Sequence, residues 1–88
     1  MSPADEVRLK RARLRAWRRG FREADLILGP FADTQLGAMG DEALGQFERL
    51  LEANDAEVYA WIVGTAPAPA EFDTEVMTAL RKSIETGK

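Results

Sequence analysis

Arg19, Gly20 and Glu23 form the pattern Arg-Gly-x-x-Glu, in which Arg19 and Glu23 carry charged side chains on either side of a glycine. A guanidinium and a carboxylate at this spacing supply charged hydrogen-bonding groups, which suit binding rather than bond-breaking. The same residues also have a complete local explanation. Arg19 would interact with the last carbonyls of one helix, Gly20 would supply a left-handed turn, and Glu23 would lie in the first turn of the next helix. Local sequence therefore leaves a binding role and a structural role open.

Composition excludes most kinds of catalytic site. The chain contains no cysteine and no histidine. It therefore has no disulfide and no thiolate that could act as a nucleophile or bind a metal. It also lacks the imidazole groups that most often serve as general bases. Its glycines do not follow the spacing of the common nucleotide-binding loops. We expect a protein that is not an enzyme, with no catalytic, cofactor-binding or metal-ligating residues.

Length and hydropathy predict one small folded domain over residues 1–88. Apolar residues make up 45% of the chain and charged residues 31%, which is ordinary for a globular protein. No apolar run approaches the ~20 residues that span a bilayer, and the N-terminal sequence lacks the apolar segment of a secretory signal. We therefore expect a bacterial cytoplasmic protein that does not insert directly into a membrane.

Charge is divided unevenly along the chain. Residues 1–22 carry eight basic and two acidic side chains, a sum of +6, whereas residues 23–88 carry four and thirteen, a sum of −9, which gives the net −3. A set of arginines recurs at steps of three and four and so shares one face of a helix. This basic stripe consists of Arg8, Arg11, Arg15 and Arg18. It predicts either ion pairs with the protein's own acids or a docking surface for an acidic partner.

Nucleic-acid binding is a further interpretation of the basic stripe, because arginines at helical spacing can neutralise phosphates. The isoelectric point of about 4.9 and the acidic remainder of the chain argue against it. The sequence also contains no recognisable RRM, KH or zinc-finger signature. We therefore expect no nucleic-acid partner.

Helix signals account for most of the chain and predict an all-α fold, a small compact bundle of five helices. We expect the first helix over residues 4–19 and the second from about residue 21. A kink or an end of the second helix is expected at Gly29 and Pro30, which disfavour a helix interior. A loop is expected over residues 37–40.

The second half of the chain predicts the remaining helices. Asp41 is expected to lie at the start of the third helix. Asp55 is expected to cap the fourth helix, which Gly64 ends. A stiff Ala/Pro connector over residues 65–70 leads to the last helix. The apolar stripes of these segments predict the core residues Leu44, Phe47, Leu51, Val58, Trp61, Ile62, Phe72, Val76, Leu80 and Ile84.

Three stretches of the sequence, in order, resemble a known family. They are WRRGFREADLILGPF at residues 17–31, DEALGQFERLLEANDAEVYAWIVG at 41–64, and an amphipathic final helix after a proline-interrupted linker. Together they resemble the succinate dehydrogenase assembly factors, which include bacterial SdhE and mitochondrial assembly factor 2 and carry an RGxxE motif. The family is built as a compact five-helix bundle. Its members are FAD assembly factors with a chaperone-like role, and they promote flavinylation, the covalent attachment of FAD to the dehydrogenase flavoprotein subunit.

The resemblance implies a partner and a site. The partner would be the apo-flavoprotein subunit of succinate dehydrogenase, with that of fumarate reductase as a second candidate. FAD would be attached to a histidine of the partner, and this chain, which we expect to be a monomer, would not bind FAD tightly itself. Arg19, Gly20 and Glu23 would contact the partner, with Arg18 and Asp25 as second contacts. Replacing Gly20 by arginine or Glu23 by alanine would remove activity with little change in melting temperature.

A basic-faced helical adaptor, or an antitoxin-like interaction protein, is the alternative that the residues leave open. Such a protein would use the basic stripe on a different acidic partner. Its binding would disappear at high salt and would not depend on Glu23, because a screened charge patch would account for the affinity.

Overall fold

A computed structural model describes residues 3–18 and 20–86, and within this part of the chain it contains helices and no strand. A π-helical turn, η1, and a short 3-10 turn, η2, join the α-helices. In chain order the elements are α1 (Pro3–Trp17), α2 (Arg22–Phe31), η1 (Ala32–Leu36), α3 (Gly37–Met39), α4 (Asp41–Glu52), α5 (Asp55–Val63), η2 (Ala70–Phe72) and α6 (Glu75–Thr86). Since α2, η1 and α3 are continuous, the described residues form five helical units. The predicted all-α five-helix bundle is confirmed.

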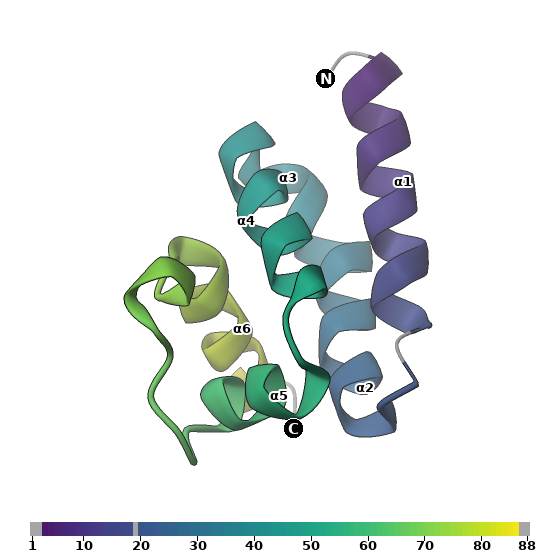
Figure 1. The fold of residues 1–88 in the computed structure, drawn as a ribbon. Coiled ribbons are helices and arrows are strands. Elements are labelled where there is room, and N and C mark those ends of the chain that lie inside the picture. Colours follow the sequence, from purple (N-terminus) through teal and green to yellow (C-terminus); the bar gives the residue numbers. More distant parts are fainter. Residues whose placement is uncertain (1–2, 19, 87–88) are drawn as a thin grey trace.

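The first two helical units lie side by side and lead into the rest of the bundle (Figure 1). α1 contacts α2, η1 and α4, while α6 contacts α2, α4 and α5. The chain turns sharply between α1 and α2, and this turn lies at the end of α1 away from the N-terminus (Figure 1). We call residues 18–23 the corner. It carries the Arg-Gly-x-x-Glu motif.

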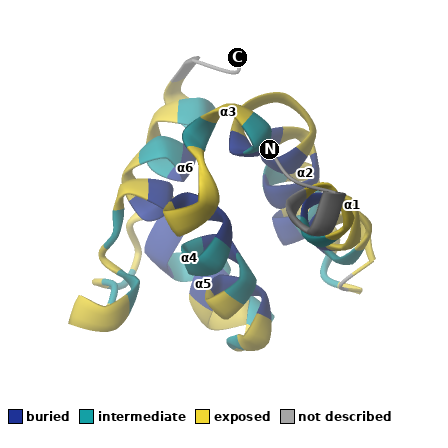
Figure 2. Ribbon diagram, turned by 90° about the horizontal axis from the view of Figure 1, so that it is seen from above, coloured by how far each residue is buried: buried dark blue, intermediate teal, exposed yellow. Residues whose placement is uncertain are grey.

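Apolar side chains from every α-helix except the short α3 form one continuous core (Figure 2). Its centre includes Phe31 and Phe47, whose ring centroids lie 5.8 Å apart. Trp61 stacks on Phe72 with a centroid distance of 5.1 Å, so this tryptophan is a packing residue, as its spacing predicted. The predicted core residues that are buried are Leu44, Phe47, Leu51, Val58, Trp61, Ile62, Val76 and Leu80. Phe72 and Ile84 are half-buried and pack against them.

The second helix does not stop where the sequence predicted. Pro30 lies inside the helix, and the chain remains helical through η1 and α3 up to Met39, so the helix does not end at Gly29 and Pro30, and the loop expected over residues 37–40 is reduced to Gly40. The alternative expectation, a kink at Pro30, stays a prediction. A proline inside a helix costs roughly 3 kcal/mol. Burying Phe31 and Leu36 completely returns about 1.5–3 kcal/mol for each side chain. Core packing therefore outweighs the local preference, and Gly40, with φ of 99°, is where the helical backbone ends.

The caps of α5 follow a slightly different pattern from the prediction. Asn54, not Asp55, is the N-cap, because the backbone is extended at Asn54 and its side-chain oxygen accepts a hydrogen bond from the Glu57 N–H at 3.1 Å. Asp55 is the first helical residue. Gly64 ends the helix in the left-handed conformation, as predicted. Both Asn and Asp cap helices well, so composition alone did not choose between them.

Candidate functional site

The corner is built around a left-handed glycine. Gly20 has φ of 84°, which confirms the predicted turn. Phe21 is extended and precedes α2 without a side-chain cap, so Glu23 lies in the first turn of α2. Arg18 is the first residue after α1, which ends at Trp17 rather than at the predicted residue 19. Arg19 lies outside the described residues.

The motif residues of the corner that the structure describes face solvent. Gly20 and Glu23 are exposed, and so is Arg18. The side chain of Glu23 makes no hydrogen bond or ion pair with any described residue, so its charge acts on the fold through the favourable position at a helix N-terminus. Asp25 is half-buried, and its N–H donates to the Phe21 carbonyl at 2.9 Å. Arg18, Gly20 and Glu23 are thus all exposed within six residues of the chain, whereas Asp25 is half-buried.

The positive φ of Gly20 changes one expectation from the sequence. A side chain in the left-handed region costs about 1–2 kcal/mol, so Gly20→Arg cannot leave the melting temperature nearly unchanged. We expect Gly20→Ala to lower the free energy of unfolding by about this amount, measured by urea denaturation. Gly45→Ala is the matched control, because Gly45 lies inside α4 with open space around it and alanine there stabilises by roughly 0.5–1 kcal/mol. Equal effects of the two substitutions would contradict the role of the turn.

The basic stripe separates into two pairs of arginines. Arg8 donates to Asp41 Oδ1 at 2.7 Å and to Glu48 Oε1 at 2.6 Å. Arg15 Nη2 lies 3.1 Å from Glu52 Oε1. These ion pairs attach α1 to α4, so half of the stripe follows the interpretation of internal pairing. Arg11 and Arg18 are exposed and form no ion pair with any described residue.

The Arg8 pairs keep this side chain charged. The hydrogen bond to Glu48 is the largest cause that raises the pKa of Arg8 above its ordinary value, desolvation opposes it, and the charges of Glu48 and Asp41 add to the rise. Because arginine is already protonated at neutral pH, the raised pKa gives no pH dependence in the physiological range. Arg8 therefore acts as a permanent positive charge between α1 and α4.

The side of α1 that faces away from the core combines apolar and basic groups. Val7 is 56% exposed and Leu14 52% exposed, while Leu9, Ala12 and Ala16 on the opposite side are buried. At 100° per residue, Arg11 and Arg18 fall on the same side as Val7 and Leu14. We call these residues, Val7, Arg11, Leu14 and Arg18, the outer face of α1. A hollow of about 310 Å³ lies beside it and is lined by Leu14, Arg15, Arg18 and Asp55.

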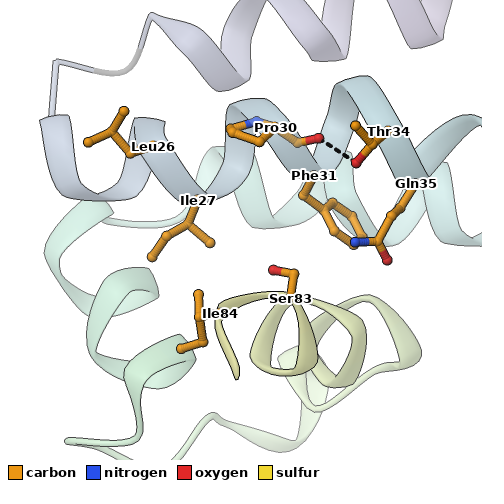
Figure 3. A pocket seen from close by; sticks show the side chains of 8 residues that line it. All are labelled: Leu26, Ile27, Pro30, Phe31, Thr34, Gln35, Ser83 and Ile84. Atoms are coloured by element: carbon orange, nitrogen blue, oxygen red, sulfur yellow. Dashed lines mark hydrogen bonds between the residues drawn. The ribbon is translucent and has the colours of Figure 1, made fainter. Parts of the chain in front are cut away.

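A cleft between two helical units begins one helical turn after Glu23. It has a volume of about 490 Å³ and separates α2 and η1 from α6 (Figure 3). Its lining contains no charged residue and consists of Leu26, Ile27, Pro30, Phe31, Thr34, Gln35, Ser83 and Ile84. Leu26 is 58% exposed and lies one helical turn after Glu23, a surface position that sequence reasoning missed. Its signal was an apolar residue outside the periodic core stripe of α2.

Within residues 3–18 and 20–86, no group of three acidic side chains is placed to hold a metal ion. Among the described helices, none combines the length and apolar character that crossing a bilayer requires. Phe21 packs on Tyr59 with ring centroids 5.6 Å apart, so Tyr59 supports the corner.

Comparison with known proteins gives a consistent family match. Residues 10–84 match the family model described as flavinator of succinate dehydrogenase, Sdh5. Succinate dehydrogenase assembly factor 2-A, mitochondrial, of Drosophila yakuba is 33% identical over 85 residues, covering 94% of this chain and 52% of the relative. Succinate dehydrogenase assembly factor 2, mitochondrial, of Aspergillus terreus is 37% identical over 89 residues, covering 96% of this chain and 30% of the relative.

The family match covers only part of the relatives' length and has no counterpart among solved structures. The chain spans about half the length of the Drosophila relative that it matches. No solved structure matches it significantly. The similarity nevertheless includes the corner and all five helical units, because the family model begins within α1 and ends within α6.

Proposed function

Because the chain belongs to the family of succinate dehydrogenase flavinators, we propose that it binds the apo-flavoprotein subunit of that enzyme and promotes covalent attachment of FAD to it. The observation that carries this proposal within the family is the exposed corner. Glu23 and Gly20 are accessible, and Glu23 has no partner among the described residues. A carboxylate left without a partner at a sharp turn is well suited to accept hydrogen bonds from another protein.

The chemistry proposed for this chain is positioning. In this proposal the residue that takes the flavin is a histidine of the partner, as the family resemblance implies, and this agrees with a chain that has no histidine. The barrier would fall because the bound chain holds the apo-flavoprotein and FAD in a reactive arrangement, and such ordering can supply several kcal/mol. Tight binding of FAD to this chain alone is not part of the proposal.

We assign the contacts as follows. Glu23 accepts hydrogen bonds from the flavoprotein, and Gly20 lets the partner backbone approach closely because it has no side chain. Arg18 and Arg19 provide charge-assisted contacts to an acidic group, and the half-buried Asp25 is a second contact. The flavoprotein of succinate dehydrogenase is the primary client, and that of fumarate reductase is a second client to test.

The outer face of α1 extends this surface and should steer the partner. Reversing charge with Arg11→Glu and Arg18→Glu is expected to slow association with the apo-flavoprotein by at least about tenfold at low salt, because electrostatic steering raises association rates by factors of 10–10³. Arg49→Glu is the control for charge reversal elsewhere, since Arg49 is exposed in the last turn of α4. Stopped-flow association rates at low and high salt provide the measurement. Similar slowing by the Arg49 variant would show that net charge, rather than this face, is responsible.

Complex formation tests the proposed partner. The chain should co-elute with purified apo-flavoprotein as a defined complex, and its own mass in solution should be that of a monomer. Separate mixtures with the succinate dehydrogenase and fumarate reductase flavoproteins establish the client range. Failure to bind either flavoprotein at tens of micromolar would overturn the proposal.

The alternative function, a basic-faced adaptor of the antitoxin-like kind, rests on the outer face of α1 alone. It predicts binding to an acidic partner that is abolished by salt and unchanged by Glu23→Gln. The exposed arginines, Arg11 and Arg18, are the observation that favours it. The Glu23 variant therefore separates the two functions.

A further inference from the structure

One close contact joins the end of α1 to the middle of α2, directly before the corner. The indole ring of Trp17, the last residue of α1, covers the backbone of Gly29. A Cβ atom built on Gly29 would lie 2.7 Å from Cζ2 of the indole and closer still to Cδ2 and Cε2. These atoms belong to the fused part of a rigid ring, so the whole indole would have to move. Gly29 is therefore the residue that makes room for Trp17.

A hydrogen bond fixes the ring in this seat. The indole Nε1–H donates to Asp33 Oδ2 at 3.0 Å. Gly29 is buried beneath the ring although Trp17 itself is 43% exposed. One face of the indole thus packs on α2, and Asp33 in η1 holds its edge. We call Trp17, Gly29 and Asp33 the tryptophan seat.

The tryptophan seat is the last of a row of close contacts between the two helical units. On α1, Leu9, Arg13 and Trp17 lie four residues apart and so share one face. A Cβ on Gly37 would lie 3.2 Å from Leu9 Cδ2, and Arg13 Nε donates to the Ala32 carbonyl at 3.2 Å. Only the contact of Trp17 lies next to the corner, so it sets where α1 ends relative to α2.

Between Trp17 and α2, the described residues of the corner are Arg18, Gly20 and Phe21. Around Gly20 there is open space, because an added Cβ would meet nothing within 4 Å. On the far side of Gly20, Phe21 is held against Tyr59 at a centroid distance of 5.6 Å. One aromatic contact thus precedes Gly20 and another follows it. Because glycine restricts its backbone less than other residues do, loss of either contact can change the path of the chain between them.

We propose that Trp17 is a positioning residue, which through its seat on Gly29 and Asp33 sets the direction in which the corner presents Glu23 to the flavoprotein. The expected effect on flavinylation rests on the proposed function, whereas the effect of Trp17 on the direction of the corner does not. It assigns roles to Trp17, Gly29 and Asp33 that no local sequence pattern indicated. Glycine at position 29 is explained by the ring above it rather than by any need of the helix.

A mutant cycle tests the proposal with the full chain. Gly29→Ala introduces a better helix former, yet it should slow flavinylation by on the order of tenfold, because small displacements of binding groups have large effects on rate. Trp17→Ala should cause a similar loss. In the Trp17→Ala background, Gly29→Ala should have no further effect, since the ring that it displaces is absent. Independent, additive losses from the two substitutions would overturn the proposal.

Two further readouts separate positioning from simple loss of folding. Asp33→Asn keeps an oxygen that accepts from the indole N–H and should retain the wild-type rate, whereas Asp33→Ala should not. In ¹H–¹⁵N spectra of the isolated chain, Gly29→Ala should shift the amide resonances of Gly20 and Glu23. If these resonances stay in place, the positioning role is wrong even when flavinylation works. If they shift but the wild-type chain does not accelerate flavinylation, the positioning role stands and the proposed function fails.

Discussion

Glu23→Gln is expected to weaken binding to the apo-flavoprotein by on the order of 100-fold, because removing one partner of a buried, charged contact costs about 2–5 kcal/mol. The substitution keeps the shape of the side chain and removes its charge. Since Glu23 is exposed and unpaired within the described residues, the fold should lose only the helix-dipole contribution of roughly 0.3–1 kcal/mol. Titration calorimetry and thermal unfolding of the same samples measure both effects.

Glu42→Gln is the matched control for this experiment. Glu42 is also exposed and also lies in the first turn of a helix, α4. It should lose the same small helix-dipole contribution and keep full affinity. An equal loss of affinity in both variants, or unfolding of the Glu23 variant alone, would show that the motif acts on the fold rather than on the partner.

Phe47→Ala is expected to have the largest effect on stability. Phe47 is completely buried and stacks on Phe31 at 5.8 Å. Removing a buried phenylalanine costs about 3–5 kcal/mol, which is a large share of the roughly 5–15 kcal/mol that stabilises a domain. For a chain of this size the melting temperature should fall by roughly 12–40 °C. Thermal unfolding followed by circular dichroism measures the change.

Val7→Ala provides the comparison for that core variant. Val7 lies on the outer face of α1 and is 56% exposed, so its truncation should change stability by no more than about 0.5 kcal/mol. A melting temperature for Phe47→Ala close to that of Val7→Ala would mean that α2 and α4 do not pack as described.

Much of the fold could be predicted from the sequence because helical periodicity reports burial directly. Leu44, Phe47 and Leu51 recur on one face, and all of them are buried. Gly20 and Gly64 also behaved as predicted, because a glycine that leaves a helix commonly adopts the left-handed conformation. These signals act over one or two turns, which is the range in which sequence spacing determines structure.

The failures arose where distant residues decide. The helix does not end at Pro30, because Phe31 and Leu36 are buried in the core, and a local rule does not include this gain. The basic stripe separated because the acids that pair with Arg8 and Arg15 lie on α4. Only tertiary structure could show which arginines remain available to a partner.

In the candidate site, too, local features could be predicted from the sequence and contacts between helices could not. The sequence identified Gly20 and Glu23, and the structure adds that they are accessible. The sequence did not identify Trp17 and Gly29 as neighbours, because their contact joins two helices across the corner. Leu26 was missed because an exposed apolar residue has no periodic signature of its own.

Covalent flavin on the partner subunit is the most direct measure of the proposed function. Purified apo-flavoprotein is mixed with FAD, with and without this chain, and flavin fluorescence retained on the denatured subunit is followed over time. We predict a clear rise in the rate when the wild-type chain is present and little rise when the Glu23→Gln variant replaces it. The same rate with and without the chain, on a flavoprotein that can be flavinylated by another route, would contradict the account.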